Sequence, residues 1–193
     1  MTTIAGRLRR AMFVLPLVLL GACSSGAHAH SAGAATAVAS VPCPTGSSVP
    51  LAGIGTTRLP CLIDAGRQVA IGASAGRPEV INLWASWCGP CRQEATLLQA
   101  AHAATGDRVL FIGIDSQDER AAALDFLAAS GATYPQAFDE QARFAAAVGA
   151  VGLPYTVFVD ASGMIVYHQI GALTPKSLQT GLARSMSATS GSD

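Results

Sequence analysis

The sequence has no excess of basic residues, and this excludes one large class of function. Lys and Arg together number 12, which equals the number of Asp and Glu residues, and the formal net charge is zero. Nucleic-acid-binding domains carry clustered positive charge, because Lys and Arg make most of the phosphate contacts. The charge balance therefore indicates that this protein does not bind nucleic acid.

A long apolar run is also missing. The stretch 11–20, AMFVLPLVLL, is interrupted by a proline and is only half as long as the run of about 20 residues that spans a bilayer. Arg7, Arg9 and Arg10 precede it, and a basic region followed by a short apolar region is typical of a signal peptide. We predict that residues 1–22 are a signal peptide for export.

The apolar stretch ends in LGAC, residues 20–23, which resembles the lipobox of bacterial lipoproteins. The resemblance implies cleavage before Cys23 and acylation of Cys23, which would anchor the protein to the cell membrane. Ordinary secretion, with cleavage near residues 27–34, is the alternative. Residues 23–41 are mostly small and predict a flexible tether, and we predict one folded domain over residues 42–190.

The chain has five cysteines, Cys23, Cys43, Cys61, Cys88 and Cys91. If Cys23 is acylated, an even number remains, which suggests disulfides in an exported protein. Cys88 and Cys91 must lie close together, and this leaves Cys43 to pair with Cys61. That loop is rich in Gly, Pro, Ser and Thr and should not order itself by packing, so we predict a structural disulfide worth about 3 kcal/mol. A second redox relay is the alternative.

The apolar patterning from residue 79 onward alternates between strands and helices, which predicts an α/β sheet covered on both faces. An extra hairpin is predicted within 62–71. The predicted strands are 79–86, 108–115, 133–139, 155–160 and 164–171, and the predicted helices are 90–104, 118–130, 140–148 and 174–186.

Cys88 falls where the predicted strand 79–86 gives way to a helix. The unpaired N–H groups and partial positive charge of a helix N-terminus stabilise a thiolate, so Cys88 should be reactive. Cys91 lies one turn later and suits a resolving thiol. Gly89 allows a partner to approach closely, and Pro90 fits the first helical turn. Trp87 would flank the site, unless it serves only packing.

The same two cysteines could in principle hold a metal. Zinc needs two further ligands at suitable spacing, and Cys43 and Cys61 are widely separated while His102 and His168 stand alone. A copper carrier would favour a longer spacing between its cysteines and a dedicated histidine. We therefore predict neither a metal nor another cofactor.

Two segments, NLWASWCGPCRQE at 82–94 and GAVGLPYTVFVDASGMIVYHQIGALT at 149–174, resemble thioredoxin-like thiol–disulfide oxidoreductases of the TlpA and ResA type. The resemblance covers roughly residues 60–188. It implies a thioredoxin fold with an N-terminal β extension and a central β-α insertion within 116–144. It also implies that Pro154 is cis and packs against a redox-active Cys88–Cys91 disulfide, with Leu153 presenting its backbone to a substrate peptide.

Members of that subfamily often carry a glutamate three residues after the second cysteine, here Glu94. It would accept the proton that Cys91 loses, although an exposed helix glutamate is the alternative. Cytoplasmic thioredoxins have a buried aspartate where this chain has Asn82, which leaves Glu94 as the better base. Two departures from the subfamily are Ala95, in place of a common proline, and Tyr155, which we expect to alter the substrate groove.

The leading hypothesis is a membrane-anchored, extracytoplasmic protein-disulfide reductase of the cell envelope. Exported proteins with paired cysteines, apo-cytochrome c among them, would be substrates. A membrane electron-transfer partner of the CcdA or DsbD type would supply electrons, and we expect a monomer. The alternatives are an oxidase of the DsbE or DsbA type, a thiol peroxidase, and a non-catalytic binding module that uses the thioredoxin fold.

Overall fold

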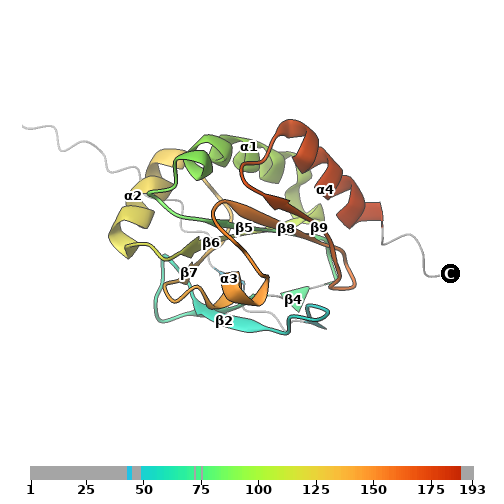
Figure 1. The fold of residues 1–193 in the computed structure, drawn as a ribbon, viewed down its shortest axis with the longest axis horizontal. Coiled ribbons are helices and arrows are strands. Elements are labelled where there is room, and N and C mark those ends of the chain that lie inside the picture. Colours follow the sequence, from blue (N-terminus) through green and yellow to red (C-terminus); the bar gives the residue numbers. More distant parts are fainter. Residues whose placement is uncertain (1–42, 45–48, 72, 75, 188–193) are drawn as a thin grey trace, which may run out of the picture. The chain divides into compact units, whose positions relative to one another are not determined.

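The computed structural model describes residues 43–44, 49–71, 73–74 and 76–187 (Figure 1). The predicted signal peptide, the predicted anchor Cys23 and the predicted tether lie outside the described residues. Among the helices within these ranges, none has the length and apolar character needed to cross a membrane.

A mixed five-stranded sheet forms the centre of the described chain (Figure 1). β5 pairs with β6 in parallel and with β8 antiparallel, and all of its residues are buried, as its apolar sequence predicts. β7 adds a third parallel strand, and β9 pairs antiparallel with β8. Across the sheet the strands are β7 (Gln136–Asp139), β6 (Leu110–Ser116), β5 (Glu79–Trp84), β8 (Tyr155–Val159) and β9 (Ile165–Ile170).

Helices cover both faces of this sheet, which confirms the predicted α/β class. α1 (Gly89–Thr105), α2 (Arg120–Ser130) and α4 (Pro175–Ser187) lie on one face, and α3 (Arg143–Ala147) lies on the other (Figure 1). A short 3₁₀ turn, Gly106–Arg108, follows α1. Because side chains alternate along a strand, Val80 packs toward α1 and α4 while Ile81 packs toward the opposite face.

The N-terminal β extension consists of two short antiparallel pairs. β1 (Val49–Pro50) pairs with β4 (Ala73–Ser74), and β2 (Thr57–Pro60) pairs with β3 (Gln68–Ile71). The predicted hairpin at 62–71 was therefore placed too late along the chain. The prediction that the segment between Cys43 and Cys61 does not order itself by packing is also wrong. Its residues Leu51 and Leu59 are fully buried in the hydrophobic core.

The disulfide between Cys43 and Cys61 closes this extension. Cys61 forms an antiparallel bridge with Ala137 of β7, and the Leu62 N–H donates to the Gln136 carbonyl at 2.8 Å. The extension is therefore attached along the outer side of β7, at the edge of the central sheet.

The predicted central insertion at 116–144 contains α2 and β7. α3 begins at Arg143, later than the predicted start at residue 140. The reason is Asp139, which is buried at the end of β7 and accepts hydrogen bonds from the N–H groups of Arg143, Phe144 and Ala145. These contacts satisfy N–H groups that have no partner within the first turn of the helix.

Candidate active site

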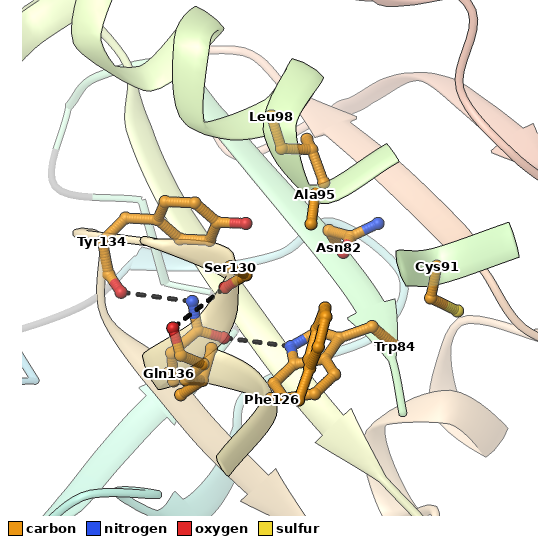
Figure 2. Close-up of a pocket in the computed structure, with 10 residues that line it drawn as sticks. Asn82, Trp84, Cys91, Ala95, Leu98, Phe126, Ser130, Tyr134 and Gln136 are labelled. Atoms are coloured by element: carbon orange, nitrogen blue, oxygen red, sulfur yellow. Dashed lines mark hydrogen bonds between the residues drawn. The ribbon is translucent and has the colours of Figure 1, made fainter. Parts of the chain in front are cut away.

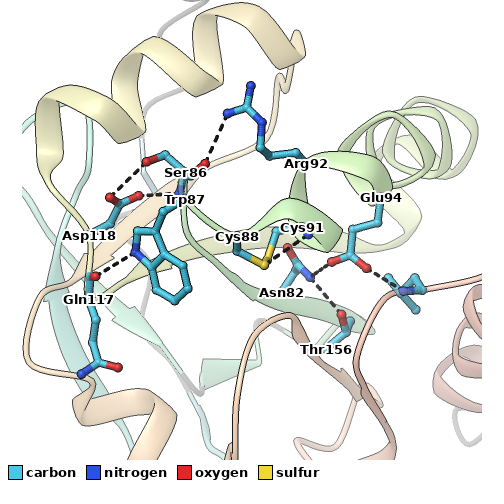
Figure 3. The surroundings of a disulfide bond; sticks show 11 residues. Asn82, Ser86, Trp87, Cys88, Cys91, Arg92, Glu94, Gln117, Asp118 and Thr156 are labelled. Carbon is cyan, nitrogen blue, oxygen red and sulfur yellow. Dashed lines mark hydrogen bonds between the residues drawn. A yellow bond between two sulfur atoms is a disulfide. The ribbon is translucent and has the colours of Figure 1, made fainter.

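Cys88 is the N-cap residue of α1 and lies four positions after the last residue of β5, Trp84 (Figure 3). Its backbone is extended, with φ −81° and ψ 105°, and its sulfur accepts a hydrogen bond from the Cys91 N–H at 3.2 Å. Cys88 and Cys91 form a disulfide. In the reduced protein the same N–H and the positive end of the α1 dipole would stabilise a thiolate at Cys88.

Exposure differs sharply between the cysteines and the residues around them. Cys88 and Cys91 retain only 4% and 2% of their accessible surface, so burial of the whole residue does not distinguish a nucleophile from a resolving thiol. Gly89 and Pro90 are exposed, and Trp87 is 62% exposed. The Trp87 ring therefore flanks the site at the surface and does not serve core packing.

The segment that leads into Cys88 is held by the loop between β6 and α2 (Figure 3). The Trp87 Nε1–H donates to the Gln117 carbonyl at 3.1 Å. The Asp118 carboxylate accepts hydrogen bonds from both the backbone N–H and the hydroxyl of Ser86. Sequence reasoning missed these contacts, because residues 86 and 118 are brought together only by the pairing of β5 with β6.

Glu94 is buried on α1, so the alternative of an exposed helix glutamate is excluded. Its Oε1 accepts from Asn82 Nδ2 at 2.8 Å, and its Oε2 accepts from the Leu173 N–H at 2.6 Å (Figure 3). Asn82 Nδ2 also donates to Thr156 Oγ1 at 2.9 Å. Burial raises the pKa of Glu94, and the hydrogen bonds from Leu173 and Asn82 offset only part of that rise.

The Leu153–Pro154 peptide bond is cis, the conformation that the resemblance implies. Leu153 packs against the buried cluster that contains Cys88 and Cys91, and the Pro154 carbonyl accepts from the Gly171 N–H at 3.0 Å. This segment therefore lies beside the disulfide although it is more than 60 residues away along the chain.

A cavity of about 170 Å³ opens beside the same segment. Val151 on its rim is 81% exposed. The lining comes from the end of β6 with the following loop and from α3 with the segment after it: Ser116, Gln117, Ala145, Ala150, Val151, Gly152 and Leu153. A surface hollow of this size beside the Leu153–Pro154 segment can receive a side chain of a bound peptide.

A second cavity lies behind Cys91, between α1 and α2 (Figure 2). Gln136 borders it, accepts from Trp84 Nε1 at 3.0 Å and donates to the Tyr134 carbonyl at 3.2 Å. The cavity measures about 10 Å³, which is space for one water molecule and too little for an organic cofactor.

Tyr155 does not line the groove, which corrects the expectation drawn from the sequence. Its ring is buried on the face of the sheet that packs against α3, because it alternates with Thr156 along β8. The Tyr155 hydroxyl donates to the Val148 carbonyl at 3.4 Å, and its ring stacks on His168 with centroids 5.9 Å apart. Tyr155 thus connects the segment after Pro154 to the end of α3.

Residues 40–182 match the Redoxin family. The chain belongs to that family. It is 32% identical over 122 residues to the thiol:disulfide interchange protein DsbE of Xylella fastidiosa (strain Temecula1), which covers 63% of this chain and 61% of that protein. It is 34% identical over 129 residues to the thiol:disulfide interchange protein CycY of Rhizobium leguminosarum bv. viciae, covering 66% and 64%.

The chain thus spans less than two thirds of the length of these curated relatives. Among solved structures, a DsbF homologue from Corynebacterium diphtheriae matches with a TM-score of 0.61 and 27% identity. The match covers 72% of this chain and 88% of that chain. The central sheet with its covering helices is a thioredoxin-like fold.

The thioredoxin-like fold places the two disulfides in different parts of the domain. Cys88 and Cys91 lie after the central strand β5, whereas the Cys43–Cys61 disulfide lies at the β7 edge. Within the described part of the chain, no three His, Cys, Asp or Glu side chains are placed so that they could bind a metal ion.

Proposed function

We propose that this Redoxin-family chain is a membrane-anchored, extracytoplasmic thiol–disulfide oxidoreductase that reduces disulfides of exported proteins. The observation that carries the proposal is the Cys88–Cys91 disulfide at the N-terminus of α1, with a backbone N–H directed at the Cys88 sulfur. The names of the relatives, thiol:disulfide interchange proteins, support thiol–disulfide exchange as the chemistry of this pair.

The proposed reaction begins with both cysteines reduced. The Cys88 thiolate attacks one sulfur of a substrate disulfide, forms a mixed disulfide, and the other substrate sulfur leaves as a thiolate that takes a proton from water. Cys91 then loses its proton and attacks the Cys88 sulfur, which releases the second substrate thiolate and closes the Cys88–Cys91 bond. Two electrons pass to the substrate, and a dithiol of a partner must return them.

Glu94 is the proposed acceptor of the Cys91 proton. It lies three residues further along α1, on the buried side of the helix. A raised pKa improves a carboxylate as a general base near neutral pH. The N–H groups of Asn82 and Leu173 hold both of its oxygens in place, so the carboxylate does not need to reorganise when the proton arrives.

The substrate peptide is proposed to bind across the exposed surface beside the disulfide. Trp87, Gly89 and Pro90 would form one side of this surface, and the Leu153 backbone next to Pro154 would form the other. The approach is open because, apart from its chain neighbours and the backbone of α1, no atom lies within 4 Å of the position that a Cβ at Gly89 would occupy.

The finer assignment follows the sequence prediction. Residues 1–22 would be removed, Cys23 would carry the lipid anchor, and the tether 23–41 would hold the domain 42–190 away from the cell membrane as a monomer. We assign the chain to the TlpA and ResA type, with a CcdA-like or DsbD-like membrane protein as electron donor. Exported proteins, including apo-cytochrome c, are the proposed substrates.

The reduction potential of the Cys88–Cys91 pair decides the direction of electron flow. We expect a value near the roughly −270 mV of thioredoxin when the purified protein is equilibrated with glutathione redox buffers, together with reduction of insulin disulfides. A potential near the roughly −120 mV of DsbA would instead establish an oxidase. Failure to exchange disulfides with any thiol, although the pair is intact, would favour a binding module.

Replacing Glu94 with Gln should remove one ionisation from the pH profile of disulfide exchange. In the wild type, the rate of the Cys91 step should increase as pH rises through the raised pKa of Glu94, because only the ionised carboxylate accepts a proton. The variant should lose this rise and about 100- to 10,000-fold of the rate above that pKa. The measurement is stopped-flow release of substrate thiol across pH.

The matched control is Glu140→Gln, which removes an exposed carboxyl outside the site. It should leave both the rate and its pH profile unchanged. An unaltered profile in the Glu94→Gln variant would remove Glu94 from the mechanism.

A further inference from the structure

Asp115 is a completely buried acid for which the proposed reaction has no use. It lies near the end of β6, paired in register with Trp84 of β5, and alternation places it on the face covered by α1 and α2. No donor group of a described residue reaches either of its carboxyl oxygens. A buried carboxylate without a donor is costly, so the carboxyl group must be protonated or must acquire a partner.

Asp118, in the loop that follows β6, is the carboxyl group whose charge acts on Asp115. The Asp118 carboxylate accepts the two hydrogen bonds from Ser86 and another from the Glu119 N–H at 2.7 Å. A second carboxyl group can hydrogen-bond to this one only when a proton lies between them. Asp118 thus interacts with Asp115 on one side and with Ser86, in the segment that leads to Cys88, on the other.

The two carboxyls hold their protons very differently. Burial and the neighbouring charge of Asp118 raise the pKa of Asp115 to about 8, against a weaker opposing effect of Arg120. Burial also acts to raise the pKa of Asp118, but the hydrogen bonds from Ser86 and Glu119 outweigh it and lower that pKa. Near neutral pH the pair therefore carries one proton, on Asp115, and one negative charge, on Asp118.

The other neighbours of Asp115 do not change this balance. Its strand neighbours Trp84 and Phe138 are uncharged. Arg120 is the cation that acts on it, but its guanidinium donates to the carbonyls of Cys61 and Leu62. The nearby acid Asp139 is turned to the other face of the sheet, where it caps α3.

We propose that Asp118 is a positioning residue that fixes Ser86 and Trp87, and through them Cys88, and that protonated Asp115 holds Asp118 in place by a hydrogen bond. This rests on the proposed function for its effect on rate, but the geometry is independent of it. Gln117 takes part through its carbonyl, which binds the Trp87 indole, and adopts a left-handed backbone with φ 55°. Loss of the proton from Asp115 would place two like charges together and loosen this loop.

The decisive experiment follows the Trp87 indole N–H by NMR in the oxidised protein, where neither Cys88 nor Cys91 can titrate. We expect its resonance to shift with a midpoint near pH 8 in the wild type. Asp115→Asn should abolish the shift, since an amide cannot ionise, whereas the exposed control Asp125→Asn on α2 should retain it.

Kinetics test the positioning itself. Reduction of the Cys88–Cys91 bond by dithiothreitol is measured for each variant relative to the wild type at each pH, which cancels the titration of the reagent. Asp118→Ala should slow the reaction by up to about 100-fold, the size of effect that a misplacement of about 1 Å can cause. Asp125→Ala should not slow it. Asp115→Asn should match the wild type at neutral pH and exceed it above the midpoint.

Several results would overturn the proposal. A Trp87 resonance that does not shift across this range in the wild type would do so, even if Asp115→Asn failed to fold. A shift that persists in Asp115→Asn, or an unchanged reduction rate in Asp118→Ala, would have the same meaning. A chain that reduces no protein disulfide but shows the expected Trp87 titration would refute the proposed function and leave the loop geometry standing.

Discussion

Replacing Cys88 with Ser should reduce thiol–disulfide exchange to the background rate of the substrate alone, because the attacking thiolate is gone. Replacing Cys91 with Ala should give a different result. The first attack would proceed, but nothing would resolve the mixed disulfide, so substrate should accumulate covalently bound to Cys88. Insulin turnover and intact-mass spectrometry under non-reducing conditions measure the two outcomes.

The pair of variants is its own control, since each removes one sulfur from the same site. Covalent capture by Cys88→Ser with no capture by Cys91→Ala would reverse the proposed roles of the two cysteines. This test matters because Cys88 and Cys91 are buried to a similar extent. The roles rest on the position of Cys88 as N-cap and on the N–H that points at its sulfur.

Removing the other disulfide should affect stability and leave the redox chemistry intact. Cys43 and Cys61 are separated by 18 positions. Without the bond, the unfolded chain regains the entropy of a loop of that size, and a Cys43→Ala/Cys61→Ala variant should lose about 3 kcal/mol of unfolding free energy. Urea denaturation, followed by tryptophan fluorescence at constant redox buffer, measures the loss.

The same variant separates a structural role from a second redox relay. A structural bond predicts an unchanged Cys88–Cys91 potential and unchanged insulin reduction at temperatures where the variant remains folded. A fall in turnover by the folded variant, with its stability loss compensated by lower temperature, would favour the relay. Cys61 bridges to β7 at the edge of the central sheet, whereas Cys88 is the N-cap of α1, and this position agrees with the structural role.

Much of the fold could be predicted from patterns that extend over only a few residues. The apolar run of β5 indicated a buried strand, and Thr174 and Pro175 indicated the start of α4, where the Thr174 hydroxyl accepts from the Ser177 N–H. Cys88 could be placed at a strand-to-helix junction for the same reason. Local sequence determines these features, because each depends on capping or periodicity within a turn or two.

Contacts between distant segments could not be predicted in this way. Glu94 could be placed on α1, but its partner Leu173 lies in the loop before α4, 79 positions along the chain. The sequence pattern predicts Asp115 at the end of a strand and Asp118 at the start of a helix. Their relation to Ser86 depends on the register of β6 against β5, which the sequence alone does not specify. The prediction for Tyr155 is wrong because the face of β8 on which it lies depends on the packing of β8 between β5 and β9.

The attachment of the N-terminal extension along β7 has a consequence for solubility. An edge strand with free N–H and C=O groups is a template on which another chain can add a strand and begin to aggregate. In this protein Cys61 and Leu62 occupy part of that edge, and Arg120 holds their carbonyls. The Cys43–Cys61 bond therefore also keeps a protective cover in place, and its loss would expose β7 to edge-to-edge association between molecules.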